Sequence, residues 1–189
     1  MKRIKTLAII LLFTLSTWSN YGQTLEFKDF KYSSTEYVLD EKYANEEEVI
    51  LERNIKSEYV FNDDSAIEFY LFHEKTLINS DNAIERNNKV YLPSKINDVL
   101  IVNKLRVILK NGKIIELKAS DIKEEVDQQT NMQYKYFAVN GLEKGAVIER
   151  YYILKKKPEV TGQSIIMQNS VPVLKTTLEL IYPNHLVFS

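Results

Sequence analysis

Apolar and polar residues alternate along several stretches of this chain, and this alternation constrains the fold more than any other feature. A period of two is typical of a half-buried β-strand. In the stretch from Val49 to Phe61, one predicted face carries Val49, Leu51, Ile55, Tyr59 and Phe61, and the other carries Glu52, Asn54, Lys56 and Glu58. The stretch from Ala66 to Ile78 has apolar residues on both faces, which predicts a strand covered on both sides.

The strongest local prediction is a hairpin between Leu105 and Lys118. Apolar residues alternate with basic ones up to Lys110, and Asn111-Gly112 leads into a second run. Asn-Gly between two alternating runs favours a type I′ turn, because both central residues of that turn need positive φ.

Other segments complete the predicted sheet. Strands are expected at 90–93, 134–139, 146–157 and 174–182, a pairing segment at 164–168, a short helix near 39–48, a polar connection at 80–89, and a loop with a helical turn at 119–133. The 146–157 strand is apolar on both faces, so we expect it to be central. Short strands joined by turns predict an all-β, mainly antiparallel, β-sandwich-like domain with at most one or two short helices.

Residues 1–22 have the three parts of a secretory signal. Lys2, Arg3 and Lys5 precede an apolar run at 7–15, and a polar stretch follows. The run is shorter than the roughly 20 residues that span a bilayer, so no integral membrane span is expected after cleavage. We therefore expect export to the periplasm, the cell envelope or the exterior. The mature chain would hold a lead-in and first strand at 23–56, and the sandwich-like domain at 57–189.

Composition excludes several functions. The formal net charge is −1, and the only basic run is Lys155 to Lys157, so the clustered basic face of a nucleic-acid binder is missing. The chain has no cysteine, which excludes disulfides, thiolate metal sites and a catalytic thiol. With 5 glycines it carries neither glycine-rich nucleotide fingerprint. No cofactor is expected.

The residue types for catalysis or metal binding are sparse. Of the 2 histidines, His73 falls on an apolar strand face, where a hydrogen-bonded structural role is the default, and His185 resembles a turn residue. The acidic groups Glu46-Glu47-Glu48, Asp63-Asp64 and Glu124-Glu125 lack the alternating spacing of a calcium loop, and solvated positions are expected. We therefore assign no catalytic, cofactor or metal residue.

The tyrosines leave one alternative open. Tyr134, Tyr136, Tyr151 and Tyr152 fall on neighbouring predicted strands. Exposed rings there could stack on sugars, which predicts a glycan- or small-ligand-binding sheet. Otherwise they are core residues and cross-strand pairs, since tyrosine is a common strand former. Exposure of the rings distinguishes the two.

The order of segments from about Ser57 to Phe188 resembles a known family. The segments that carry the resemblance are 74–79 (EKTLIN), 90–93 (VYLP), 105–117 with its Asn-Gly hairpin, 120–122 (SDI), 136–151 (YFAVNGLEKGAVIERY), 172–174 (PVL) and 178–183 (LELIYP). Together they resemble the domain of unknown function 3857 family, which precedes a transglutaminase-like domain in exported bacterial proteins. Residues 145–151 are the most specific part.

The resemblance implies a β-sandwich of unknown role, with any catalysis supplied by a Cys-His-Asp site in a following papain-like domain. No position here matches that site, so no catalytic residue carries over. It implies a non-catalytic interaction or accessory module whose partner is a protein, either a neighbouring domain or an envelope component. Because the chain ends inside a strand-like run at 185–189, we expect the domain to be truncated at its C-terminus.

Overall fold

A computed structural model describes residues 30–32, 37–62, 65–93, 97–159, 164–168 and 170–184 of the chain. The chain divides into two units, Met1–Ser33 and Ser34–Ser189, and the second contains every element described below. The expected signal peptide and the turn residues Asp63 and Asp64 lie outside the described residues.

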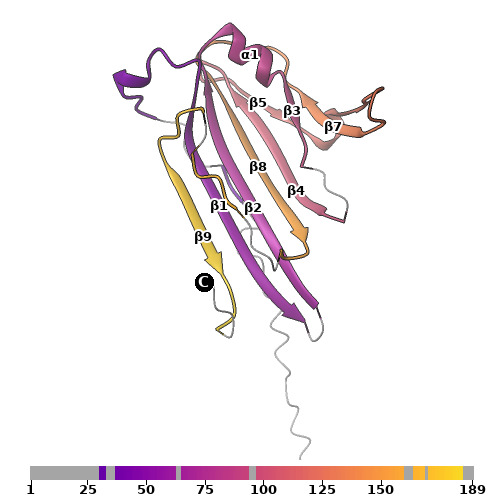
Figure 1. Cartoon of the computed structure of the whole chain (residues 1–189). Helices are drawn as coiled ribbons and strands as arrows, with labels where there is room; N and C mark the ends of the chain where they lie inside the picture. Colours follow the sequence, from indigo (N-terminus) through magenta and orange to yellow (C-terminus); the bar gives the residue numbers. More distant parts are fainter. Residues whose placement is uncertain are drawn as a thin grey trace, which may run out of the picture. The chain divides into compact units, whose positions relative to one another are not determined.

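Six strands form the larger sheet, in the order β5–β4–β8–β2–β1–β9 (Figure 1). The bounds are β1 Glu48–Asn62, β2 Ser65–Ile78, β4 Val99–Ile108, β5 Ile114–Leu117, β8 Ala146–Lys156 and β9 Thr176–Ile181. Every neighbouring pair is antiparallel except β1 and β9, which are parallel. The strand predicted to be central, β8, lies between β4 and β2, as its two apolar faces require.

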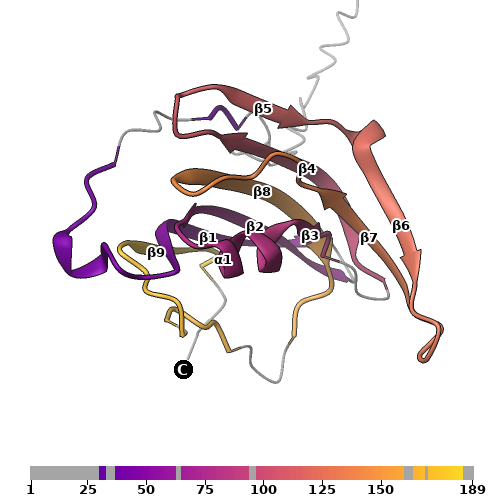
Figure 2. The same cartoon turned by 90° about the horizontal axis from the view of Figure 1, so that it is seen from above.

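Three shorter strands form a second sheet, in the order β3–β7–β6. They are β3 Lys89–Tyr91, β6 Ile122–Val126 and β7 Gln133–Ala138, and the helical segments are η1 Glu41–Tyr43, α1 Asp81–Asn87 and η2 Ala119–Asp121. Figure 2 shows β6 turning away from β5 where the two sheets meet. The described part of the chain is mostly β with one short α-helix, so the predicted all-β, sandwich-like class is confirmed.

The apolar core lies on both faces of one end of the larger sheet. Between that sheet, the smaller sheet and α1, the buried cluster comprises Ile78, Ala83, Leu105, Val107, Phe137, Val139, Ala146 and Ile148. On the opposite face, Val49, Leu51, Leu77, Ile108 and Val147 form a second cluster under Leu39, Tyr43 and Leu174. Burial of these side chains is the main favourable term for the fold.

The long β1–β2 ladder contains an irregularity that corrects the predicted faces of β1. The register shifts between Ile50 and Glu52. An extra residue in one strand reverses the side-chain alternation beyond it. Val49 pairs with Leu77 and Ile55 with Phe72, so these two β1 residues lie on opposite faces of the sheet. The prediction that they share a face was wrong, because a bulge leaves no mark in the apolar pattern.

The β4–β5 hairpin forms where it was predicted, with a different turn. Gly112 has φ of +82° but Asn111 is not among the residues with positive φ, so the turn is not type I′. The amide of Gly112 donates to the carbonyl of Leu109 at 2.8 Å, and the amide of Leu109 donates to the carbonyl of Lys113 at 2.9 Å. This pattern fits a three-residue loop with glycine in the left-handed position.

Two elements were missed in segments predicted to be polar connections. Helix α1 replaces the connection at 80–89, and Ser80 caps it by accepting the amide of Ala83 at 3.0 Å. A serine before an acidic first turn is an N-terminal helix signal, so the sequence contained the information. Strand β6 occupies part of the predicted loop at 119–133, and its exposed, charged residues hid its pairing with β7. Segment 164–168 forms no strand.

Among the residues that the structure describes, no helix is both long enough and apolar enough to cross a membrane.

Candidate functional site

The corner cleft is a hollow of about 380 Å³ at the point where the two sheets meet. It is lined by Val107, Ile115, Glu116, Leu117, Ser120, Asp121, Ile122, Lys123, Ala138, Val139 and Asn140. Its size is at the lower end of the range for small-molecule pockets, roughly 300–1,000 Å³. The chain path β5–η2–β6 forms one wall and the end of β7 the other, so the sheet corner itself positions the lining.

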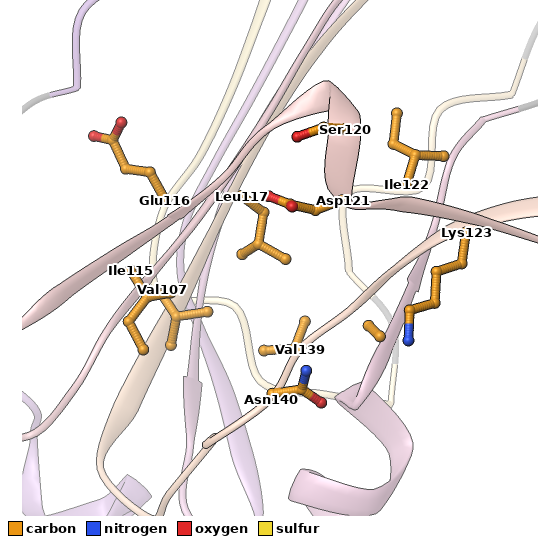
Figure 3. A pocket seen from close by; sticks show the side chains of 11 residues that line it. Val107, Ile115, Glu116, Leu117, Ser120, Asp121, Ile122, Lys123, Val139 and Asn140 are labelled. Atoms are coloured by element: carbon orange, nitrogen blue, oxygen red, sulfur yellow. The ribbon is translucent and has the colours of Figure 1, made fainter.

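The floor of the cleft is apolar and belongs to the core. Val107 is 1% exposed and Val139 5%, and Ile115, Leu117 and Ile122 pack against the same cluster while remaining half-buried. Figure 3 shows Val107, Leu117 and Val139 around the hollow. Because these side chains are fixed by sheet packing, the floor is formed before any ligand arrives.

The rim of the cleft is polar. Asp121 accepts the backbone amide of Lys118 at 2.7 Å, which holds its carboxylate in place. Glu116 points away from the hollow, whereas Lys123 and Asn140 lie at its edge (Figure 3). Among the described residues, no side-chain hydrogen bond or ion pair engages Lys123, Ser120 or Asn140. The rim therefore offers the carboxylate of Asp121, the amino group of Lys123 and two neutral hydrogen-bonding side chains above an apolar floor.

His73 lies on β2 and is enclosed by polar partners from two neighbouring strands. Its Nε2 is 2.8 Å from Oε1 of Glu149 on β8, and its Nδ1 is 3.1 Å from Nδ2 of Asn54 on β1. An amide nitrogen donates, so Nδ1 is the acceptor and Nε2–H donates to the carboxylate. With its side chain 7% exposed and both ring nitrogens engaged, the ring links three strands.

Glu149, fully buried, is the centre of a network of charged side chains. Its Oε2 lies 2.6 Å from both Nε and Nη2 of Arg106, and its Oε1 lies 3.9 Å from Nζ of Lys75. Burial by itself raises the pKa of this carboxyl, but hydrogen bonds from His73 and Arg106 and the charges of Arg106 and Lys75 more than offset it, so the pKa is lowered. Glu149 is therefore an anion at neutral pH, held by donors and poorly suited to donate a proton.

Of the acidic residues singled out in the sequence, Glu47, Glu48, Glu124 and Glu125 make ion pairs. Glu47 accepts from Asn82 and Arg86, and these hydrogen bonds lower its pKa. Lys135 binds Glu124 at 2.8 Å and Lys89 binds Glu125 at 2.6 Å. In the described ranges, no group of three or more His, Cys, Asp or Glu residues could hold a metal ion. His185 lies outside those ranges.

The four predicted tyrosines divide into buried and accessible rings. Tyr151 is fully buried on the His73 face, and that burial raises the pKa of its hydroxyl. Tyr152, half-buried, stacks on Phe72 with 5.1 Å between ring centroids. Tyr134, 37% exposed, and half-buried Tyr136 lie on β7 of the smaller sheet. The two predicted strands that carry these tyrosines, β7 and β8, therefore lie in different sheets.

Tyr91 on β3 completes the exposed group on the smaller sheet. It is 47% exposed, and its ring centroid lies 6.0 Å from that of Tyr134 and 5.7 Å from that of Tyr136. We call Tyr91, Tyr134 and Tyr136 the tyrosine cluster. Sequence reasoning missed Tyr91, because nothing local indicates that β3 pairs with β7.

Sequence reasoning also missed the corner cleft and the Glu149 network. The cleft joins residues that are far apart in the chain, from Val107 to Asn140, and no local motif marks them. Arg106 is one of the basic residues that alternate with apolar ones in the predicted hairpin, yet it is only 6% exposed. A signal for Glu149 did exist, because a lone acid inside a strand apolar on both faces must find a partner.

Comparison with known proteins places the fold among solved structures. A crystal structure of a putative protease from Parabacteroides distasonis is similar with a TM-score of 0.58 at 15% sequence identity. The similarity covers 73% of this chain but 29% of that protein, so the present chain spans less than a third of its length. Among curated proteins, nothing matches significantly. The sequence model of the family described as a domain of unknown function with a solved structure, DUF3857, matches residues 69–188. This chain belongs to the DUF3857 family.

Proposed function

We propose that this chain is a non-catalytic, exported module that docks against another domain. Two observations support this. In the Parabacteroides protein the shared fold accounts for 29% of the chain, so in that setting the fold coexists with other parts of a larger protein. The leader at residues 1–22 supports export.

The absence of cysteine and the state of the described titratable groups support a non-catalytic role. A thiol nucleophile requires cysteine, and the chain has 0. His73, which would be the obvious general base, is already engaged at both ring nitrogens by Glu149 and Asn54. A base in that position has no acceptor atom directed at a substrate.

The observation that carries the docking proposal is an apolar row on the edge strand β9. Leu178 and Leu180 on β9, and Tyr182 immediately after its last residue, occupy alternate positions and are 38%, 39% and 45% exposed. In an isolated domain, a row of exposed apolar side chains along an edge strand favours association between copies of the protein. In a larger protein the same row is suited to contact a neighbouring domain. The partner proposed is therefore a folded protein domain with an apolar contact surface.

A site-specific crosslink in the producing cells tests this proposal. A photoreactive phenylalanine analogue at position 180 should give one discrete crosslinked product that mass spectrometry identifies as a transglutaminase-like or protease-like domain. The same analogue at Lys144, which is 54% exposed in its side chain near the opposite end of the larger sheet, is the control and should give none. Equal products from both positions, or none from position 180, would contradict docking at β9.

A catalytic role is tested separately. The purified chain should show no amide hydrolysis and no amine transfer to a glutamine-containing protein above the buffer rate. Turnover that persists through purification and disappears in His73→Asn, with the far-ultraviolet circular dichroism unchanged, would overturn the non-catalytic assignment.

Glycan binding is a second candidate, favoured by the exposure of the tyrosine cluster. Lys89 binds Glu125 and Lys135 binds Glu124 beside the cluster, whereas Lys123, opposite Tyr136, makes no ion pair with a described residue. Tyrosine rings stack on a sugar without needing its charge, so a neutral sugar tests this candidate. Neutral hexasaccharides titrated into the isotope-labelled chain should shift the β3 and β7 amide resonances. Tyr134→Ala should abolish the shifts, and Tyr182→Ala, just after β9 of the larger sheet, should not. Shifts spread evenly over the chain would reject this candidate.

A further inference from the structure

We propose that the corner cleft binds a small zwitterion with an apolar body, of the class of apolar amino acids and short apolar peptides. The proposal assigns a ligand to a hollow that neither the docking row on β9 nor the tyrosine cluster uses. It does not depend on the proposed function.

The floor of the cleft is apolar and fixed in place. Val107 and Val139 are core residues that hold their positions through packing, with Leu117 beside them. Their surfaces turned toward the hollow are apolar, and an apolar group displaces water there favourably. A branched aliphatic or aromatic side chain of a ligand would complete this packing.

The rim of the cleft carries a cation that makes no ion pair with a described residue. The smaller sheet carries Lys89, Lys123 and Lys135 in its described strands. The first and third bind Glu125 and Glu124 at 2.6 Å and 2.8 Å, whereas Lys123 makes no ion pair with any described residue. Lys123 is also the lysine that lines the cleft. A ligand carboxylate would supply the partner that Lys123 lacks.

The same rim carries a carboxylate. Asp121 is held by the amide of Lys118, so its carboxylate is fixed at the edge of the hollow without being neutralised by a cation. A purely anionic ligand would be repelled by Asp121, and a purely cationic one by Lys123. A ligand that carries both charges satisfies both residues, and this complementarity selects a zwitterion.

The probe for this proposal is the unblocked dipeptide Leu-Leu, titrated into the full chain and followed by methyl resonances. Saturable shifts should appear at the methyl groups of Val107, Ile115, Leu117 and Val139. Lys123→Met and Asp121→Asn should each weaken binding about five- to tenfold, since each removes one charge-assisted contact at a partly exposed site. Asn at position 121 can still accept the Lys118 amide, so the local structure is preserved.

Two controls separate this proposal from nonspecific apolar binding. Lys135→Met removes a lysine of the same sheet outside the cleft and should leave the affinity unchanged. The N-acetylated, C-amidated dipeptide has the same apolar body without charges, and should bind at least tenfold more weakly and respond to neither cleft variant. The proposal is overturned if the blocked dipeptide binds equally well, if Lys135→Met weakens binding as much as Lys123→Met, or if the cleft methyl groups show no saturable shift.

Discussion

Two neighbouring residues of β8 show how differently the two faces of the larger sheet are stabilised. Ile148 faces the smaller sheet and lies in the apolar cluster with Leu105 and Val107. Glu149 faces the other way and is bound by Arg106 and His73. Both residues are buried, at 5% and 0% exposure. The face of Ile148, the apolar face, is held by packing. The face of Glu149, the charged face, carries the second apolar cluster with Val147 at one end, and beyond that cluster it is held by directed hydrogen bonds between charged groups.

The charged face extends well beyond Glu149. Lys75 lies 3.9 Å from Glu149 and 3.5 Å from Glu52, and Glu52 lies 3.1 Å from Lys175, just before β9. The residues of this network, Arg106, Glu149, Lys75 and Glu52, come in turn from β4, β8, β2 and β1. Apolar packing tolerates a change of side-chain shape more easily than this network of ion pairs, whose directed contacts require one alignment across all four strands. The comparison indicates that apolar packing supplies stability on the Ile148 face, whereas the ion pairs on the Glu149 face align the strands.

The largest expected effect is removal of the central carboxylate. Glu149→Leu leaves Arg106, His73 and Lys75 without their shared anion, and breaking a buried pair on one side costs about 3–5 kcal/mol. Urea unfolding followed by circular dichroism measures the loss in the free energy of unfolding. The double variant Glu149→Leu, Arg106→Leu should recover part of it, because the unpaired guanidinium is removed as well. If Glu149→Leu lowered the free energy of unfolding by no more than a conservative core change does, the two faces would not differ in how they are stabilised.

A smaller effect in the same network is its dependence on pH, because protonation leaves the Glu149 side chain in place. The pKa of Glu149 is lower in the folded chain than its ordinary value of about 4.3, so its stabilisation is present above that value. It is lost as the pH falls through the folded pKa. Between pH 6 and pH 3 the free energy of unfolding should therefore fall more in the wild-type chain than in Glu149→Gln. Parallel curves for the two would contradict a charged Glu149.

The smallest effect is expected on the apolar face. Ile148→Val removes one buried methylene group and should lower the free energy of unfolding by about 0.5–1.5 kcal/mol. The loss should be the same at pH 6 and pH 3, because packing carries no charge. A loss that varied with pH would show that the two faces are coupled through β8.

Much of the larger sheet could be predicted from the sequence. The alternation in β1 and β2, the Asn-Gly hairpin and the apolar β8 all formed at the expected positions. These are local properties, since side-chain period and turn residues act within a few positions along the chain. The faces of β1 could not be predicted correctly, because the bulge near Leu51 is selected by the pairing with β2 rather than by β1 itself.

The candidate sites depended almost entirely on long-range pairing. The pairing of β3 with β7 brought Tyr91 to Tyr134, and β5, η2 and β6 together closed the corner cleft. Tyr151 and Tyr152 are adjacent in sequence, yet one is buried on the Glu149 face and the other stacks on Phe72 across the sheet.

The sequence by itself determined that this protein is a β-rich chain without a thiol or a phosphate loop, because composition and period are properties of the chain alone. Only the tertiary structure decided which of its polar groups are buried partners and which remain available on a surface. Arg106 and Lys123 both lie in strands, but Arg106 meets Glu149 and Lys123 meets no described anion. That difference follows from strand order, which sets the neighbours of each charge and is not encoded within either strand.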